Sequence, residues 1–185
     1  HDPDKEPPFS FQINPNNLIV SDTFPFPPRS SDVHHEVELA VALKSGGRNI
    51  PIDQALDHVF GYAVSLDMTR RDLQGEAKKM GRHWEIGKAF EASAQITPLI
   101  PADGFGHPDK GAIILKVNGA VRQEGNLNQM IWKIPEMISY LSDYFELAAG
   151  DVILTGTPAG VGPVQRSDRM EATVAGLPAL SVTVV

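Results

Sequence analysis

A run of alternating residue types in the first quarter of the chain constrains the fold more than any other feature of the sequence. Polar or small residues alternate there with aliphatic ones, in the order Glu36, Val37, Glu38, Leu39, Ala40 and Val41. A period of two is typical of a β-strand with one buried face. Gly46 and Gly47 follow and are expected to end the strand.

Further patterns predict more strands, with few helices between them. Asn118 and Gly119 together suit the two positive φ angles of a type I′ turn, so they predict a hairpin. The other predicted strands are 58–66, 112–117, 120–123, 151–154, 170–174 and 179–184, and the predicted helices are 53–59, 72–80 before Gly81, and 134–145 before Gly150. Strands outnumber helices and do not alternate with them regularly, so we expect an α+β, mostly β fold.

The length of 185 residues favours a single domain with a substantial core. Seven of the 15 prolines fall within residues 1–33, with phenylalanines between them. Because proline fixes φ and removes a backbone donor, we expect 1–33 to be extended and to pack on the core through its phenylalanines. Residues 34–185 are then expected to form the main domain.

The charge balance and the absence of cysteine exclude several classes of site. The chain has 16 Lys and Arg against 23 Asp and Glu, a formal charge of -7, so we expect no nucleic-acid partner and no membrane partner. Without cysteine there are no disulfides, thiolate zinc sites or cysteine nucleophiles. Neither a transmembrane helix nor a signal peptide is predicted, and a cytoplasmic location is expected.

Three carboxylates are candidates for a metal site. Glu36 and Glu38 are two residues apart on the predicted strand, so both side chains project from one face, with Cα atoms about 6.6 Å apart. Asp67 follows another apolar strand. Oxygen ligands suit Mg²⁺, Mn²⁺ or Ca²⁺. On spacing alone the alternative is favoured, in which Glu36 and Glu38 form the solvated face of an edge strand and Asp67 caps a helix.

Other residues near these acids are candidates for binding roles. Lys88 stands beside apolar residues rather than in a run of charges, so it is a better candidate for a functional amine than Lys78 or Lys79. His34 is expected to act as a hydrogen-bonding neighbour of the acids, and His35 to be partly buried with a partner. The glycine-rich segment 155–163 follows a strand and either binds an anion or forms a tight structural turn.

Four motifs stand in order along the chain, at His34–Leu39 (HHEVEL), Ser65–Asp72 (SLDMTRRD), Lys116–Gly119 (KVNG) and Thr155–Gly162 (TGTPAGVG). Together they resemble the fumarylacetoacetate hydrolase family, most closely its acylpyruvase and fumarylpyruvate hydrolase branch. The resemblance covers essentially the whole chain. It implies a mixed β-sandwich or β-roll with few short helices, a homodimer, and a catalytic domain over residues 34–185.

The resemblance also implies site residues and a cofactor. One Mg²⁺ or Mn²⁺ per subunit is expected, with Ca²⁺ left open. The positions that match the metal ligands are Glu36, Glu38 and Asp67. The positions that match substrate contacts are Arg71, Gln74, Lys88 and Thr157. Of these, Lys88 is the expected catalytic residue, next to a developing enolate.

The implied reaction is hydrolysis of a 2,4-diketo acid. Such an acid chelates the cation through its 2-keto oxygen and carboxylate, and the polarised carbonyl lets the enolate of pyruvate leave. Water adds to the 4-keto carbon once a base removes its proton. The products are pyruvate and a carboxylic acid. We therefore expect a hydrolase of fumarylpyruvate or another acylpyruvate in the breakdown of aromatic compounds.

The base in that branch is a histidine and a glutamate, three residues apart, before the proline-rich stretch. Whether such a pair stands upstream of His1 is left open, and finding one there would favour hydrolysis over decarboxylation. His1 and Asp4 have the spacing, but the acid and the context differ. The role is therefore not assigned to them.

Two other functions remain open from the sequence. The same metal and Lys88 would serve a decarboxylase or isomerase of oxaloacetate or of a 2-oxo or 2-hydroxydienoic diacid, which needs no water-activating base. The other alternative is a non-catalytic binding domain in which the cation is structural.

Overall fold

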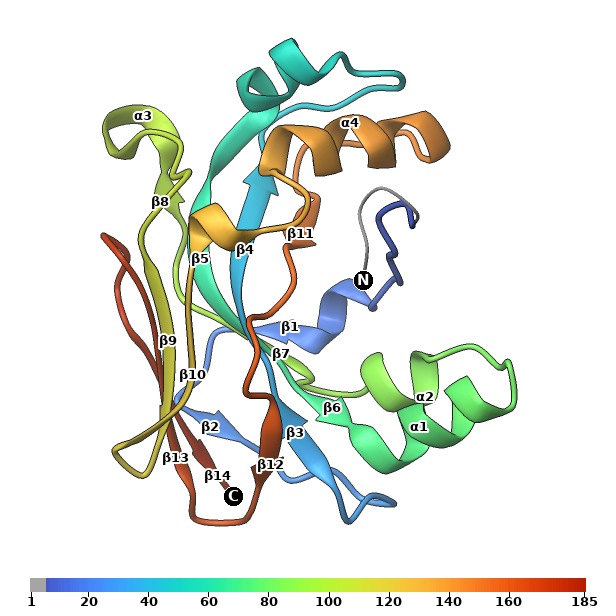
Figure 1. The fold of residues 1–185 in the computed structure, drawn as a ribbon, viewed down its shortest axis with the longest axis vertical. Coiled ribbons are helices and arrows are strands. Elements are labelled where there is room, and N and C mark those ends of the chain that lie inside the picture. The colour runs from blue at the N-terminus through green and yellow to red at the C-terminus, as the bar shows by residue number, and fades with distance from the viewer. Residues whose placement is uncertain (1–5) are drawn as a thin grey trace.

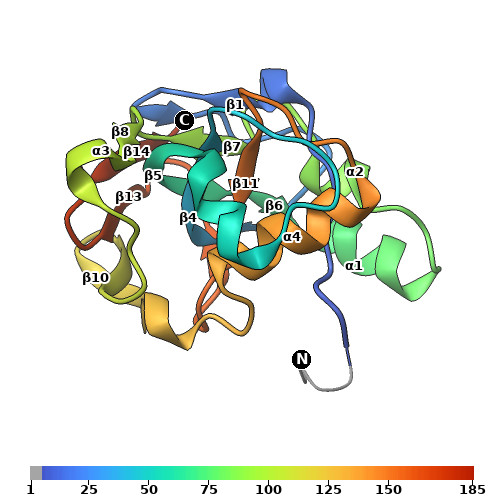
Figure 2. The same cartoon turned by 90° about the horizontal axis from the view of Figure 1, so that it is seen from above.

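The computed structural model describes residues 6–185, which form two large β-sheets, one small β-sheet and several short helices (Figure 1). His1 and Asp4 lie outside the described residues. Helices α1 (Arg71–Lys79) and α2 (Glu85–Lys88) project from the side opposite the hairpin of β9 (Ala112–Val117) and β10 (Ala120–Asn126), as both ribbon views show (Figure 2). The mostly β architecture expected from the sequence is therefore confirmed.

The first large sheet has the order β1-β7-β5-β4-β11, with β8 paired to β5. Its strands are β1 (Leu18–Ile19), β7 (Ala94–Ile96), β5 (Val59–Asp67), β4 (Val37–Leu43), β11 (Val152–Leu154) and β8 (Ile100–Pro101). Strands β4 and β5 are antiparallel, with Leu39 opposite Val64. The two strands form the centre of the sheet.

The expectation of a single buried face on β4 is wrong, because every residue of this strand is buried. One face contributes Leu39 and Val41 to the main hydrophobic core. On the other face Ala40 packs with Ala63 and Ile96 in a second, smaller cluster. Glu38 shares this second face, so it enters the interior rather than the solvent.

The second large sheet has the order β10-β9-β13-β14-β2. Its strands are β10 (Ala120–Asn126), β9 (Ala112–Val117), β13 (Arg169–Val174), β14 (Leu180–Val184) and β2 (Thr23–Phe24). Asn118 and Gly119 have φ of 51° and 81°, which confirms the predicted hairpin turn. The main core includes Leu115 and Met170 from this sheet, together with Leu39 and Val64 from the first.

The small sheet has the order β12-β3-β6 and divides the strand that the alternation predicts. Its strands are β3 (Val33–His35), β6 (Thr69–Arg70) and β12 (Gly162–Val164). Glu36 lies between β3 and β4, where the chain leaves the small sheet and enters the first large sheet. The period of two continues through this point, so the sequence pattern contains no sign of the break.

The helices are short, as expected. They are η1 (Pro15–Asn17), η2 (Ile52–His58), α1 (Arg71–Lys79), α2 (Glu85–Lys88), α3 (Ala102–Phe105), η3 (Leu127–Gln129) and α4 (Ile134–Tyr144). The prediction that Gly150 closes α4 is wrong, because the helix ends at Tyr144 and Gly150 lies in a later turn with φ of 93°. No helix in residues 6–185 is long and apolar enough to cross a bilayer.

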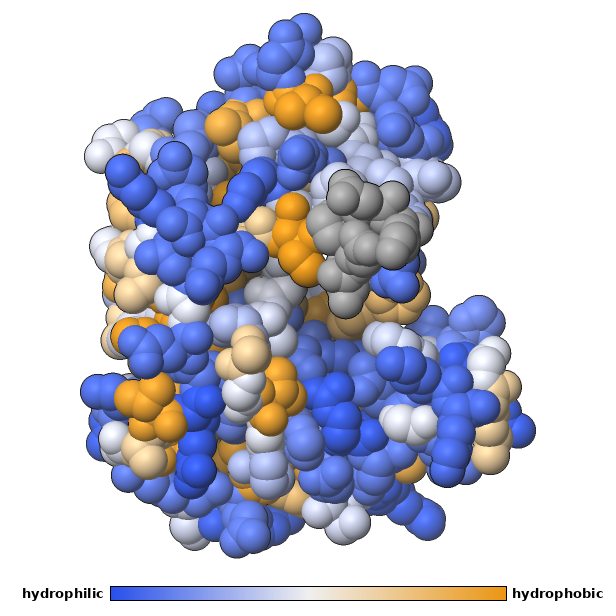
Figure 3. Space-filling view, viewed as in Figure 1, coloured by the Kyte–Doolittle hydropathy of each residue, from blue (hydrophilic) through white to orange (hydrophobic). Residues whose placement is uncertain are grey.

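The proline-rich stretch contributes short strands to both large sheets. Strand β1 pairs with β7, and β2 pairs with β14. Phe24 is fully buried, whereas Phe9 is exposed and stacks against Trp84 at 4.9 Å between ring centroids. On the face seen in Figure 3, hydrophobic side chains gather only in small separate groups among hydrophilic ones.

Candidate metal centre and substrate site

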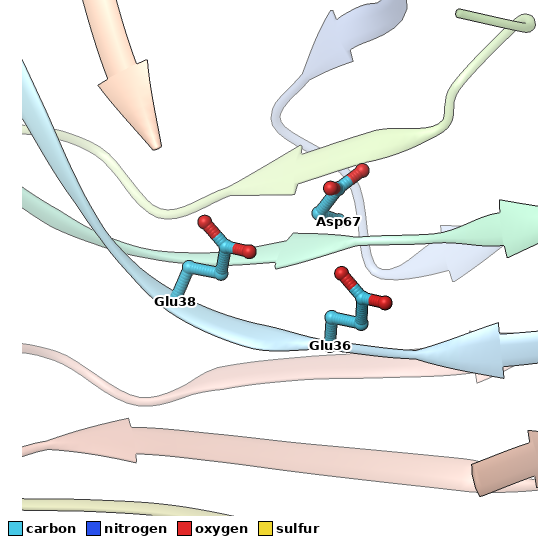
Figure 4. A group of neighbouring side chains, drawn as sticks. All are labelled: Glu36, Glu38 and Asp67. Carbon is cyan, nitrogen blue, oxygen red and sulfur yellow. The ribbon is translucent and has the colours of Figure 1, made fainter. Parts of the chain in front are cut away.

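Three carboxylates meet where the first large sheet joins the small one. One oxygen from each of Glu36, Glu38 and Asp67 lies within 4.8 Å of the others, and all three residues are buried. Figure 4 shows the side chains extending to the same side of β4 and β5. The interpretation of Glu36 and Glu38 as the solvated face of an edge strand is therefore wrong.

The backbone brings these acids together from separate strands. Glu38 lies opposite Ser65 in the β4–β5 ladder, and Asp67 is the last residue of β5. The N–H of Asp67 donates to the carbonyl oxygen of Glu36 over 2.9 Å. From the other side, the N–H of Gly156 donates to Oε2 of Glu38 over 2.7 Å. The acids are thus held by rigid strands and one tight loop.

Lys88 reaches into this acidic cluster from the C-terminal end of α2. Its Nζ donates to Oε2 of Glu36 at 2.8 Å and to Oδ2 of Asp67 at 2.7 Å. The third donor is used on Oγ1 of Thr69 at 2.6 Å. Lys88 is only 2% exposed, so it is not a solvated surface charge.

Arg71, at the start of α1, contacts the cluster from its solvent side. One Nη donates to Glu36, and the other donates to Oε1 of Gln74 over 2.7 Å. Its Nε donates to Nδ1 of His34 over 3.4 Å, and Nε2 of His34 pairs with Oδ1 of Asp32 at 2.8 Å. His34 thus forms hydrogen bonds, as expected, but its partners are Arg71 and Asp32 rather than the three acids.

The local electrostatics favour positive charge in the cluster. Burial raises the pKa of Glu38 to about 8, with further contributions from the charges of Asp67 and Glu36. Burial also raises the pKa of Asp67 to about 6, although Lys88 opposes this. Burial lowers the pKa of Lys88, but Asp67 and Glu36 more than offset the effect, so the net shift is upward. Lys88 is thus charged, while Glu38 and Asp67 resist ionisation.

The residues present fit a divalent cation. Among residues 6–185, the three carboxylates face two cationic side chains, Lys88 and Arg71. Oδ1 of Asp67 is buried and has no hydrogen-bond partner in the part of the chain that the structure describes. A buried acceptor without a donor costs free energy, and a cation in contact with it removes that cost. Carboxylate oxygens are the ligands that Mg²⁺ and Mn²⁺ prefer.

Close packing of two helices brings Gln74 and Lys88 to the same site. A Cβ on Gly87 would lie 2.9 Å from the backbone nitrogen of Gln74, a distance that real Cβ atoms essentially never show. Glycine therefore allows α2 to lie directly against α1. Gln74 is buried beside Arg71, so the structure brings together Arg71, Gln74 and Lys88.

Thr157 lies in the loop between β11 and β12 and is anchored to β4. Its Oγ1 donates to the carbonyl oxygen of Val37 over 2.8 Å. The same oxygen accepts a bond of 2.8 Å from Nε2 of Gln123, a residue that the sequence analysis did not select. The loop contains Gly156 and Gly160 with φ of 92° and 99°, conformations that favour glycine. The site thus includes a third segment, far away in sequence.

Two further contacts were missed by reasoning from the sequence. The ring of Phe11 lies over Nζ of Lys88, 5.2 Å from the ring centroid, and also contacts Trp84. His35 is buried, as expected, with Nδ1 2.9 Å from Oε1 of Gln123, and burial lowers its pKa. Aromatic content in 1–33 was the available signal for Phe11, whereas no local pattern marks Gln123.

Comparison with known proteins adds independent findings. Residues 1–185 match the family described as fumarylacetoacetate (FAA) hydrolase C-terminal. The fumarylpyruvate hydrolase of a Ralstonia species is 42% identical over 177 residues, which cover 95% of this chain and 92% of that protein. The human mitochondrial oxaloacetate tautomerase is 45% identical over 158 residues, which cover 85% and 72% respectively.

A solved structure is similar over the whole chain. The crystal structure of fumarylpyruvate hydrolase from Pseudomonas aeruginosa in complex with Mn²⁺ and pyruvate is 49% identical, with a TM-score of 0.97. The match covers 100% of this chain and 81% of that one. The fold inferred from four motifs is thereby confirmed.

Proposed function

Because the chain belongs to the fumarylacetoacetate hydrolase family, we propose that it hydrolyses the carbon–carbon bond of a 2,4-diketo acid, fumarylpyruvate or another acylpyruvate, with a divalent metal ion. The products are pyruvate and a carboxylic acid. Membership of this family also bears out the expectation of a hydrolase-type enzyme.

The observation that carries this proposal is the buried triad of Glu36, Glu38 and Asp67 with Lys88 inserted between two of its members. A structural cation alone would not require a buried amine beside it, because the amine competes for the same carboxylates. An amine and a cation together provide two positive centres at one place. That arrangement suits a reaction in which an oxygen becomes negatively charged.

We assign the ion-holding role to Glu36, Glu38 and Asp67, with Mg²⁺ or Mn²⁺ as the ion. When bound, the ion supplies Lewis-acid polarisation of the 2-keto group and stabilises the enolate of pyruvate. The similar Pseudomonas protein was crystallised with Mn²⁺ and pyruvate, which supports this choice of ion and product.

Lys88 is the proposed catalytic residue. Its raised pKa keeps the ammonium charged, and three hydrogen bonds fix its position beside Asp67 and Glu36. An ammonium held in this way stabilises negative charge on an enolate oxygen without moving during the reaction. The carbon–carbon bond then breaks with its electron pair on the pyruvate carbon, which takes a proton.

Arg71, Gln74 and Thr157 are the proposed substrate-binding residues. The guanidinium of Arg71 is partly exposed at the mouth of the cluster and matches a carboxylate in shape and charge. Oε1 of Gln74 accepts a hydrogen bond from one Nη of Arg71 and so helps to orient the guanidinium. Water must supply the hydroxyl of the new carboxylic acid, and none of the described residues is assigned as the base that deprotonates this water.

An assay of pyruvate formation tests the proposal. The protein loaded with Mn²⁺ or Mg²⁺ is incubated with acetylpyruvate and fumarylpyruvate, and pyruvate is followed with a coupled dehydrogenase. We expect turnover with the ion and none after chelation. Failure to release pyruvate from any acylpyruvate, in a protein shown to bind the ion, would overturn the proposal.

Oxaloacetate is the substrate of the second candidate function, as a decarboxylase or isomerase. The observation in its favour is that Lys88 and the acidic triad are complete in this chain, whereas none of the described residues has been assigned as the water-activating base. The human relative named as an oxaloacetate tautomerase supports the same idea. Release of CO₂ and the rate of keto–enol exchange, both measured with oxaloacetate, discriminate it from hydrolysis.

A non-catalytic domain with a structural cation remains the third candidate. The variant Glu38→Ala separates it from an enzyme, because a structural ion predicts a lower melting temperature. A catalytic ion predicts lost activity in a protein that is still folded. The homodimer and the cytoplasmic location stay predictions, and light scattering after gel filtration tests the first of them.

A further inference from the structure

Gln123 is the buried residue of β10, a strand at the edge of its sheet whose other members are exposed or half-buried. It is 1% exposed, whereas the apolar Val121 on the same strand is 51% exposed. Apolar side chains are usually the buried ones, and a side-chain amide is costly to bury unless it is hydrogen-bonded, so the burial of Gln123 in place of Val121 is unusual. A β-bulge between Val121 and Gln123 breaks the register at this point.

All four hydrogen-bonding positions of the Gln123 amide are used. Oε1 accepts from the backbone N–H of Val37 at 3.1 Å and lies 2.9 Å from Nδ1 of His35. Nε2 donates to Oγ1 of Thr157 at 2.8 Å and to the carbonyl oxygen of Pro158 at 2.9 Å. A backbone N–H only donates and a backbone carbonyl only accepts, so both ends fix the orientation of the amide. His35 must then carry its proton on Nδ1.

The partners of the Thr157 hydroxyl likewise fix its orientation. Its proton goes to the carbonyl oxygen of Val37, and one of its lone pairs accepts from Gln123. Among residues 6–185, no acceptor is present for the backbone N–H of Thr157. Within this part of the chain the backbone N–H of Thr157 is therefore an unused donor, whereas the proton of its hydroxyl is already engaged.

The 155–163 loop also packs closely against β10, the strand that carries Gln123. A Cβ on Gly160 would lie 2.2 Å from the carbonyl oxygen of Arg122, and one on Gly125 would lie 2.9 Å from Cβ of Pro158. The β9–β10 hairpin and the 155–163 loop are thus fitted to each other without space for a side chain. The Gln123 amide ties this contact to His35 of β3 and Val37 of β4, the two residues that flank Glu36.

We propose that Gln123 is a positioning residue that fixes Thr157, and with it the 155–163 loop, for contact with the substrate. The proposal rests on the substrate-binding role of Thr157 in the proposed function. Gln123 itself does not touch the substrate. It acts by holding the backbone N–H of Thr157 at a constant place relative to Glu38 and the other acids.

Two variants of Gln123 distinguish the role of its acceptor oxygen from the role of its donor nitrogen. Gln123→Met keeps the length of the side chain and removes all four hydrogen bonds. Gln123→Glu keeps the acceptor that faces His35 and Val37 but replaces the donor that faces Thr157 and Pro158. We expect both to raise KM for acetylpyruvate about tenfold, the factor expected for one lost bond to a charged group. A smaller change in kcat is expected, because Lys88 and the triad are untouched.

A double-mutant cycle shows whether Gln123 acts through Thr157. In the Thr157→Val background the hydroxyl is already absent, so Gln123→Met should raise KM much less than in the wild-type background. Hydrogen exchange of the amides in 156–162 should become faster in Gln123→Met. Ser142→Ala is the matched control, since it removes one buried and one part-buried hydrogen bond on α4 and should lower the melting temperature without changing KM.

Three outcomes overturn the proposal. Unchanged KM and unchanged exchange in both variants would show that the tether is dispensable. Additive effects in the cycle, or changes that match those of Ser142→Ala, would show a role in stability alone. If the wild-type enzyme turns over no acylpyruvate and no oxaloacetate, the proposed function fails instead. The exchange data and the affinity for pyruvate, measured by calorimetry, then still decide whether Gln123 positions the loop.

Discussion

Lys88 and Asp67 form a buried ion pair in which only one carboxylate oxygen is used. Nζ lies 2.7 Å from Oδ2, while Oδ1 has no hydrogen-bond partner within residues 6–185. Both side chains are 3% exposed. The pair therefore neutralises part of the acidic cluster and leaves one strong acceptor available inside it.

Replacing Lys88 with methionine should remove activity and weaken the metal-free fold. Loss of a preorganised donor to the developing enolate costs about 10²–10³-fold in kcat. Three buried acids then lack their main cationic partner, which costs about 3–5 kcal/mol in the free energy of unfolding. The pyruvate assay and urea unfolding measure the two effects. Lys79→Met, on the exposed face of α1, should change neither.

The affinity for Mn²⁺ should increase with pH. The pKa of Asp67 is raised to about 6 and that of Glu38 to about 8, so the ion must displace protons below these values. Affinity should therefore rise through this range and level off above about pH 8. Calorimetry in buffers of different ionisation enthalpy measures the released protons. A flat profile would contradict the raised values.

The metal-free protein should respond to pH in the opposite direction. Both acids hold their protons more tightly in the folded state, so their contribution to stability is complete at acid pH. It is lost as pH rises through about 6 and then about 8. After chelation, the melting temperature should fall over this window. The fall should be smaller in Glu38→Gln, whose side chain does not titrate.

Adding a methyl group at Gly87 should separate α1 from α2. A Cβ there would lie 2.8–2.9 Å from atoms of Gln74, including its backbone nitrogen. We expect Gly87→Ala to lower the free energy of unfolding by about 1–3 kcal/mol and to reduce kcat by moving Lys88. Gly75→Ala is the matched control, because nothing lies within 4 Å of its Cβ. On an exposed helix it should add about 0.5–1 kcal/mol.

Lysine in place of Arg71 should weaken substrate binding. Arg71 contacts Glu36, Gln74 and His34 at once, and a single ammonium cannot reach all three in that geometry. We expect KM for an acylpyruvate to rise about tenfold with a smaller change in kcat. An equal loss in kcat would instead place Arg71 in the chemical step.

Local patterns in the sequence predicted much of the fold. Alternation identified β4, the Asn118–Gly119 pair identified the hairpin, and helical spacing identified α4. These features depend on neighbours within a few residues. The break at Glu36 was not predicted, because it depends on which sheet each half of the strand joins. The end of α4 was placed too late for a similar reason, since a helix need not stop at the next glycine.

The candidate site was predictable where its residues carry an unusual local context. Lys88 was selected because it stands among apolar residues, and Asp67 because it ends an apolar strand. Gln123 gave no such signal, since glutamine on a polar edge strand is ordinary in sequence. Its importance arises from contacts with His35 and Thr157, which are 88 and 34 residues away. Only the folded chain brings these groups together.

The two-sided burial of β4 has a consequence for how proteins of this kind diversify. Glu38 lies on β4, whose two faces pack in two hydrophobic clusters, so a shift of Glu38 would require many buried side chains to repack. The proposed substrate-binding residues Arg71 and Gln74 instead stand on one short helix, α1, at the periphery. We expect substitutions there to alter what the site accepts while the acidic triad stays in place. New substrate preferences can therefore arise on this scaffold by remodelling one side of the site.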